Sequence, residues 1–336
     1  SGVTEGPERA RSIGRVGSAT AIAPILGVTL GGPLIDWLGW KTLFLVQVAP
    51  AAVCFVLAWR WLPRVPRGRA VSFDVAGAAL LAACVTTALF ALNRVRVWGI
   101  GHPAVVGCFV AAPLLATAFV AVERRRVHPL VPLAFLRRRD VGFSLLALWF
   151  LQAVYFGGSI ANPLYLHRRF GYGVTVIAYL AALRPLGYTF GSGWSPRLRR
   201  AFGGPTTQLV GSALFTLAST VLAVLVGFHV VVLLAVAYVF AGFACGVTYT
   251  AVLTSVNDLA DPRDIGVANG VVSMVATIAQ GVGITMVASM IGDSQARSAF
   301  VNTFALMAVG AILTVVMAAI ARPRRRDHEL ESALAI

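Results

Sequence analysis

The sequence predicts an all-α integral membrane protein with about ten transmembrane helices. The clearest sign is the 57-residue stretch from Ala201 to Asn257, which contains no Asp, Glu, Lys or Arg. A helix needs about 20 apolar residues to cross a bilayer, so this stretch is long enough for two crossings with a turn near residues 227–229. The whole chain is 58% hydrophobic and 12% charged, with a mean hydropathy of +0.81. Lipid offers the backbone no hydrogen-bond partners, so each crossing is expected to be a helix.

Ten apolar segments follow one another along the chain, and charged or turn residues mark the breaks between them. The basic, proline-containing stretch 63–69 follows the second segment, and a similar stretch, 195–200, follows the sixth. Such composition is typical of loops. In order, the predicted crossings are 13–36, 41–62, 74–93, 103–122, 142–166, 174–194, 206–227, 229–256, 265–291 and 299–321.

The distribution of Lys and Arg predicts the orientation of the chain. If the N-terminus is cytoplasmic, one alternate set of loops holds 19 of the 28 basic residues and the opposite set holds six. Cytoplasmic loops carry such an excess, so we expect a multi-pass protein of the cell (plasma) membrane with both termini in the cytoplasm. The loop 123–141 has an apolar middle between two groups of three arginines, and it would lie either on an anionic leaflet or in solvent.

Several classes of function find no support in the sequence. The net charge of +15 could suggest a nucleic-acid partner, but the basic residues lie in short gaps between apolar segments and form no stripe. The four cysteines lie singly in different apolar segments without metal-ligand spacing, so no metal site is expected. No glycine-rich nucleotide loop and no Ser-His-Asp set is visible, so we expect no ATP dependence and no enzymatic activity.

Motifs along the chain resemble one transporter family. Residues 27–32 read G-V-T-L-G-G, and residues 39–44 read G-W-K-T-L-F, with Pro50 beyond them. This order resembles helices five and six of the major facilitator superfamily drug:proton antiporters, whose antiporter motif G-P-x-x-G-G is followed by G-W-R-W-x-F. Departures from the family pattern are Val28 in place of proline, Lys41 and Thr42 in place of arginine and tryptophan, and His167 where glutamine is usual.

Later segments are similar to the fourteen-helix branch of that superfamily, in the same order and spacing. Residues 123–133, 163–166 and 261–283 resemble the loop before helix nine, helix nine itself and the entry to helix thirteen. The resemblance implies that the chain holds helices 5–14 of an expected fourteen and is truncated before helix five. The implied domains are 1–62 as the last two helices of the N-terminal bundle, 63–141 as a two-helix insert with a basic cytoplasmic loop, 142–322 as the C-terminal six-helix bundle, and 323–336 as a cytoplasmic tail.

The first predicted crossing carries a face of small residues. Gly27, Gly31 and Gly32 lie at positions i, i+4 and i+5 of one helix, where the absence of side chains lets a second helix approach closely. Pro24 lies one turn before Val28 and can supply the kink of the motif's missing proline. The resemblance implies that this face seals the interface between two bundles and limits leak, although plain helix packing would use the same face.

Arg184 lies about ten residues from either end of its predicted crossing. A charge in mid-span costs at least about 2.5–3.5 kcal/mol on insertion scales, so its side chain is expected to face a cavity or a partner. It would attract an anionic or carbonyl-bearing substrate, pair with a carboxylate elsewhere in the complete protein, or bond helix carbonyls near Pro185. Asp36 and Asp74 lie at segment ends and are predicted to be interfacial, so we expect the proton site in the missing helices.

Polar and aromatic side chains of the last six crossings are the predicted substrate pathway. Polar groups turn toward the protein interior in a membrane, where each one alone is more often a contact between helices than a substrate ligand. Together they suggest a wide, weakly polar cavity for bulky amphipathic compounds. The set is Gln152, Tyr155, Asn162, Tyr165, Tyr188, Tyr249, Asn269 and Gln280.

These observations and the resemblance predict a transporter in the lipid bilayer that moves drugs or amphipathic small molecules by alternating access, and the outward direction is implied by the resemblance alone. The sequence does not determine the oligomeric state, for which we expect a monomer. The resemblance implies that inward protons are exchanged for outward substrate, so the proton gradient supplies the energy and no cofactor is expected. Two alternatives stay open. One is a major facilitator transporter for another solute, such as a sugar, an amino acid or a secreted metabolite. The other is a truncated fragment that does not transport.

Overall fold

The computed structural model describes residues 7–61, 74–126, 131, 133–225, 231–261, 264–292 and 296–322, with side chains from residue 22 onward. Within these ranges the regular structure is helical and no strand occurs. The helices are α1 (Pro7–Leu38), α2 (Trp40–Trp61), α3 (Val75–Trp98), α4 (Pro103–Glu123), α5 (Leu133–Leu136), α6 (Arg139–Phe170), α7 (Val174–Phe202), α8 (Gly204–Leu225), α9 (Val231–Asp258), α10 (Ile265–Ile291) and α11 (Arg297–Ala321).

Each predicted crossing coincides with one long helix, which confirms the predicted all-α membrane fold. Among the described residues, nine helices are long and apolar enough to span a bilayer, and α1 contributes a shorter apolar part, Ile22–Leu38. The predicted turn at 227–229 lies outside the described residues. The sixth crossing was predicted too short, because α7 continues through the basic stretch 195–200 to Phe202. Arg199 and Arg200 stand in its last turn, where cations favour the negative end of the helix dipole.

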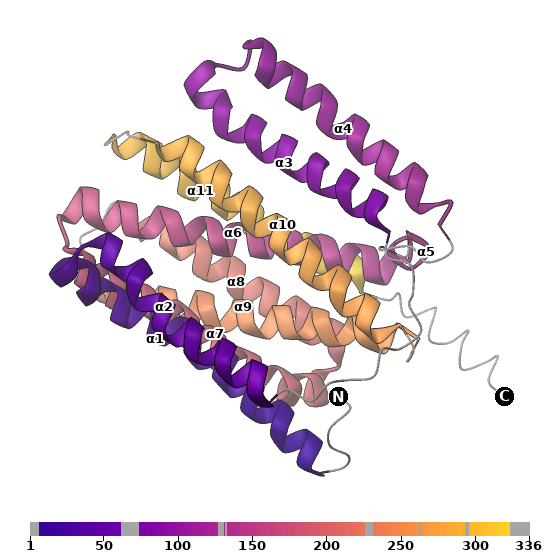
Figure 1. Ribbon diagram of the computed structural model, residues 1–336, viewed down its shortest axis with the longest axis horizontal. Coiled ribbons are helices and arrows are strands. Elements are labelled where there is room, and N and C mark those ends of the chain that lie inside the picture. Colours follow the sequence, from indigo (N-terminus) through magenta and orange to yellow (C-terminus); the bar gives the residue numbers. More distant parts are fainter. Residues whose placement is uncertain are drawn as a thin grey trace.

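The helices form a central bundle with a hairpin on each of two flanks (Figure 1). Helices α6 to α11 make the bundle, in which α7 packs on α9, α6 packs on α10 and α11, and α8 packs on α9 and α11. The α1–α2 hairpin lies against it through α1 and α7, whereas the α3–α4 hairpin lies on the opposite flank through α3 and α10. No residue of α2 is buried, so α1 makes the main contact of its hairpin with the bundle.

Contacts between helix ends agree with the predicted up-and-down course of the chain. Charged residues at the ends of the helices bond groups at the nearby ends of other helices, which requires those ends to lie on the same side of the bundle. At one side Arg199 pairs with Asp258, and Arg322 lies 3.5 Å from the Thr206 hydroxyl. At the other side Arg168 donates to the Gly292 carbonyl at 2.7 Å, Arg96 donates to the Ser289 carbonyl at 3.1 Å, and Asp36 accepts from the Thr175 amide at 3.0 Å.

Four glycines bring the backbones of α7 and α9 into contact. A Cβ atom added to Gly187 would lie 2.1 Å from the Val239 carbonyl oxygen, and one added to Gly191 would lie 2.0 Å from that of Phe243. The reciprocal positions on α9 are equally close, since a Cβ on Gly242 or Gly246 would lie 2.0 or 2.2 Å from a carbonyl oxygen of α7. Small residues allow this approach in membranes, where close van der Waals packing drives helix association.

The base of the α3–α4 hairpin contains two buried carboxylates. Asp74 caps α3 by accepting a bond from the Gly77 amide at 3.0 Å, and its carboxylate lies 3.4 Å from the guanidinium of Arg126. Glu123 accepts from the Val131 amide and is 2% exposed. The prediction that Asp74 is an interfacial residue missed its burial, because Arg126 and the end of α4 cover it. Val131 is buried against the bundle core, whereas residues 127–130 and 132 of this loop lie outside the described residues, so the choice between an anionic leaflet and solvent stays open.

Candidate functional site

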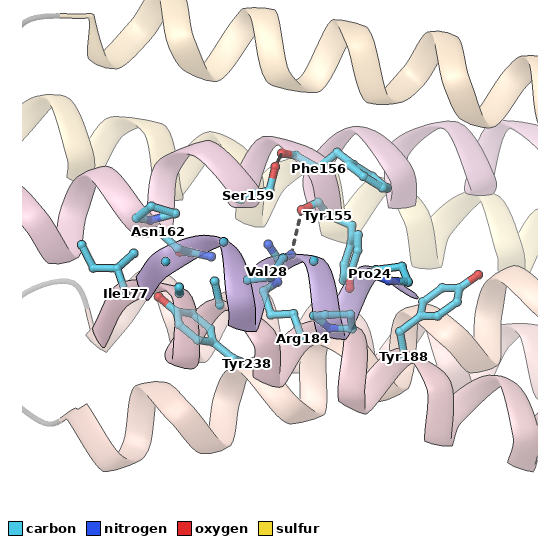
Figure 2. A pocket seen from close by; sticks show the side chains of 18 of the residues that line it. Pro24, Val28, Tyr155, Phe156, Ser159, Asn162, Ile177, Arg184, Tyr188 and Tyr238 are labelled. Carbon is cyan, nitrogen blue, oxygen red and sulfur yellow. Dashed lines mark hydrogen bonds between the residues drawn. The ribbon is translucent and has the colours of Figure 1, made fainter. Parts of the chain in front are cut away.

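A cavity of about 710 Å³ lies between α1 and the central bundle. Helices α1, α6 and α7 supply most of its lining, with single residues from α2 and α10 and two tyrosines from α9. Figure 2 shows α1 passing in front of the site, with Pro24 and Val28 facing side chains of α6 and α7. Cavities of about 300–1,000 Å³ are typical of sites for small organic ligands.

Eleven of the thirteen residues predicted for the bundle interface or the substrate pathway line this one cavity. From α1 these are Pro24, Gly27, Gly31 and Gly32, and from the bundle they are Gln152, Tyr155, Asn162, Arg184, Tyr188, Tyr249 and Gln280. Their roles in transport stay predictions, but their convergence follows from the preference of polar groups for the protein interior.

Two residues of the wider predicted pathway lie elsewhere. Tyr165 belongs to an aromatic cluster, with ring centroids 5.6 Å from Phe300 and 5.9 Å from Phe304. The Asn269 side chain accepts a hydrogen bond from that of Asn257 at 2.9 Å, and it does not line the cavity. Both therefore join helices within the bundle.

Arg184 is the single charged residue that the structure places in the lining of this cavity. Its side chain extends from α7 toward α6, where Nη2 donates to the main-chain carbonyl of Tyr155 at 2.8 Å (Figure 2). The guanidinium carbon lies 4.2 Å from the centroid of the Tyr155 ring, a favourable cation–π distance. Arg184 is only 7% exposed, and its Nε finds no hydrogen-bond partner in the part of the chain that the structure describes. The predicted mid-span charge thus faces both a cavity and a helix carbonyl.

Gly158 on α6 makes room for this guanidinium. A Cβ atom at this position would lie 3.1 Å from Nη1 and 3.2 Å from Nη2 of Arg184, and 3.1 Å from the end of Met307. These separations are shorter than most real Cβ contacts, so a larger residue would push the guanidinium away from Tyr155. Gly158 was not predicted from the sequence, because its role depends on Arg184, which lies 26 positions away on another helix.

Aromatic rings form a continuous row along one wall of the cavity. The ring centroids of Tyr155 and Tyr188 are 6.3 Å apart, and those of Tyr188 and Tyr249 are 6.2 Å apart. Phe156 adjoins the row at 5.4 Å from Tyr155. Such spacings are typical of aromatic pairs in protein interiors. Tyr238 of α9 also lines the cavity and was not among the predicted residues.

Two amide side chains add polar groups to the cavity. Asn162 is 4% exposed, and no described residue forms a hydrogen bond with its Nδ2 group. Gln152 accepts a bond from the thiol of Cys245 at 3.7 Å. Ser159, beside Asn162 on α6, lines the same space (Figure 2). No lining residue in the described part of the chain carries a carboxylate.

The glycine face of α1 serves two different purposes. A Cβ on Gly32 would lie 2.5 Å from the Cβ of Ala178 and 3.1 Å from the Cα of Thr175, so this residue permits the contact between α1 and α7. A Cβ on Gly27 or Gly31 would meet no atom within 4 Å. These two glycines therefore leave the cavity open rather than admit a neighbouring helix. Helix α1 runs without interruption through Pro24 and Pro33.

Comparisons with known proteins agree with this architecture. Matches to the family model of the Major Facilitator Superfamily cover residues 1–168 and 144–334. The puromycin resistance protein pur8 of Streptomyces alboniger is 33% identical over 221 residues, which are 63% of this chain and 42% of that protein. The tetracenomycin C resistance and export protein of Streptomyces glaucescens is 30% identical over 47% of this chain and 29% of its own length. The multidrug transporter protein MdtP of Bacillus subtilis is 24% identical over 48% of this chain and 30% of its own length.

The matched region is thus less than half the length of each of these relatives. The family matches, by contrast, extend over almost the whole chain and agree with its helical fold. The resemblance found in the motifs of α1 and α2 is thereby confirmed at the level of the superfamily. This chain, a multi-pass membrane protein, belongs to the major facilitator superfamily.

Proposed function

We propose that this chain forms part of a transporter that exports drugs or amphipathic small molecules across the cell membrane by alternating access. The observation that carries the proposal is the cavity of about 710 Å³ among membrane-spanning helices, lined by eleven of the thirteen predicted residues. Its walls are mainly apolar and aromatic with a few polar groups, as in sites that accept bulky organic compounds. The names of the relatives refer to resistance, export and multidrug transport, and they support outward transport of the substrate.

In this proposal the proton gradient drives export, and no cofactor, metal or enzymatic step takes part. A proton-driven transporter needs an ionisable group whose protonation favours one of two conformations. The described lining of the cavity offers no carboxylate that could bind and release a proton. The proton-binding group is therefore assigned to a part of the protein outside this lining. The protein is proposed to act as a monomer in the plasma membrane, with both ends of this chain in the cytoplasm.

Dye export from energised cells tests the proposal. Bacteria that lack their own efflux pumps are loaded with either rhodamine 123 or fluorescein, two dyes that share one aromatic core, and dye loss is followed with and without a protonophore. The proposal expects cells expressing the protein to lose at least one dye faster than cells with empty vector, and the protonophore to abolish the difference. Export that persists with the protonophore would refute proton coupling. Export of neither dye would favour the alternatives, a transporter for another solute or a fragment that does not transport.

A pair of glycine substitutions tests whether the cavity is the route. Gly31→Leu adds a side chain that starts in open space and fills the cavity without displacing a helix. Gly107→Leu makes the same change on α4, at an exposed position where a Cβ also meets no atom within 4 Å. Gly31→Leu is expected to slow export while Gly107→Leu leaves it unchanged, at equal amounts of protein in the membrane. Equal rates for both variants would show that the substrate passes elsewhere.

A further inference from the structure

We propose that the cavity selects anionic or carbonyl-rich planar aromatic compounds and disfavours cations of similar size. This inference rests on the proposed function only in taking the bound compound as the transported one. It concerns the chemical class of the ligand, which neither the fold nor the family determines.

The charge of the cavity favours a ligand with acceptor groups. Arg184 is its single described charge, and the residue is 7% exposed. A buried charge is costly unless a counter-charge or hydrogen bonds compensate it. Among the described residues, the guanidinium makes one hydrogen bond, to a neutral main-chain carbonyl, and its Nε makes none. An anionic or carbonyl oxygen from a ligand would supply the missing acceptor, and guanidinium groups bind carboxylates with two parallel bonds.

Two buried polar atoms of the cavity lining have no hydrogen-bond partner among the described residues, and both are donors. One is Arg184 Nε, and the other is Nδ2 of Asn162, which lies about two turns along α6 from Tyr155 and is 4% exposed. Arg184 Nε and Asn162 Nδ2 are both N–H groups, which can donate to a ligand but cannot accept from one. Because an unsatisfied buried donor is destabilising, a ligand that carries acceptors is favoured over one that carries ammonium groups.

The aromatic wall of the cavity would by itself suit a ligand of either charge. Tyr155, Tyr188 and Tyr249 offer ring faces that can stack on a planar ligand. Ring faces also attract cations, but the guanidinium of Arg184 already lies over Tyr155 at 4.2 Å. A cationic ligand entering this space would meet a like charge with no carboxylate among the described lining residues to offset it. The arrangement therefore favours a flat ring system that bears acceptor oxygens.

The experiment compares the anion fluorescein with the cation rhodamine 123. The protein is embedded in nanodiscs of uncharged phospholipid, and fluorescence anisotropy is measured as protein is titrated into each dye, with empty nanodiscs as the blank. We expect fluorescein to bind at least about tenfold more tightly, as befits a hydrogen bond to a charged group. Tighter binding of rhodamine 123, or equal binding of both dyes, would overturn the inference without requiring any variant.

Substitutions of Arg184 then assign the preference to this side chain. Arg184→Gln should weaken fluorescein binding about tenfold, and Arg184→Lys, which keeps the charge, should preserve the order of the two dyes. Arg197→Gln is the matched control, because it removes the same charge from an exposed position on the same helix outside the cavity. If Arg184→Gln binds fluorescein as tightly as the unmodified protein, Arg184 does not contact the ligand and the inference is wrong. Arg184 would behave in this way if it paired with a carboxylate from another segment.

This design separates the inference from the proposed function. Selective binding of fluorescein together with failure to export either dye would contradict the proposed function and leave the ligand class intact. Proton-driven export of rhodamine 123 together with its tighter binding would support the proposed function and refute the ligand class.

Discussion

The contact between α7 and α9 makes a sharp prediction about two glycines on one helix. Gly191 and Gly193 are two residues apart in the middle of α7, and both change to alanine by gaining one methyl group. A methyl group on Gly191 would lie 2.0 Å from the carbonyl oxygen of Phe243, whereas one on Gly193 would meet no atom within 4 Å. An ordinary contact begins near 3.4 Å, so Gly191→Ala must separate the two helices locally by about 1.4 Å.

The expected cost follows from overpacking, which typically destabilises a protein by about 1–3 kcal/mol. Both substitutions also gain helix propensity, worth up to about 1 kcal/mol relative to glycine, and this gain cancels in their difference. We therefore expect Gly191→Ala to unfold with a free energy about 1–3 kcal/mol lower than Gly193→Ala. The measurement is a reversible titration with sodium dodecyl sulfate in mixed micelles, followed by far-ultraviolet circular dichroism. A Gly191→Ala variant as stable as Gly193→Ala would refute the backbone contact.

Three further predictions concern the ends of the helices. Asp74→Ala removes the cap of α3 and should lower the free energy of unfolding by about 0.5–2 kcal/mol in the same titration. Asp74→Asn can still accept the capping hydrogen bond, so an equal loss in this variant would contradict capping as the cause. Asp258→Asn breaks the exposed pair with Arg199, so its effect should stay below about 1 kcal/mol, and a larger loss would show that the pair is shielded from solvent. The third prediction concerns topology, in a chain whose native cysteines are replaced. Arg137→Cys and Arg199→Cys should react with a membrane-impermeant maleimide added on the cytoplasmic side, and Lys41→Cys should react from the opposite side. Labelling of positions 137 and 199 from opposite sides would exclude the predicted topology.

The features of the fold that can be predicted from the sequence are those imposed by the surrounding lipid. Lipid excludes charge and unpaired backbone groups, so apolar length alone reveals each crossing. The same rule explains why Arg184, Asn162 and Gln152 were predicted to face an interior space and do line one. A polar group in mid-span has few other places to lie, and this restriction made the candidate site recognisable.

The parts that the sequence did not reveal depend on pairing between distant segments. The glycines of α7 and α9 stand at G-x-x-x-G spacing, as in Gly187 to Gly191, but this spacing does not identify the partner helix. Burial of Asp74 requires Glu123 and Arg126, which follow about fifty residues later. The helical continuation of α7 past residue 194 was missed because proline and arginine were interpreted as a break, although Pro196 and three arginines lie inside this helix.

The hydrogen bond between Arg184 and Tyr155 crosses a seam between two differently supported helices. The carbonyl of Arg184 lies against Gly242, so the base of this side chain is fixed to the closely packed α7–α9 pair, while its acceptor belongs to α6. Because donor and acceptor belong to different helices, a shift of α6 relative to α7 that lengthens this 2.8 Å separation beyond about 3.5 Å would leave the cation without its acceptor. The side chain proposed to bind the ligand is therefore also sensitive to the relative position of two helices, so the proposal links occupancy of the cavity to the geometry of the bundle at one residue.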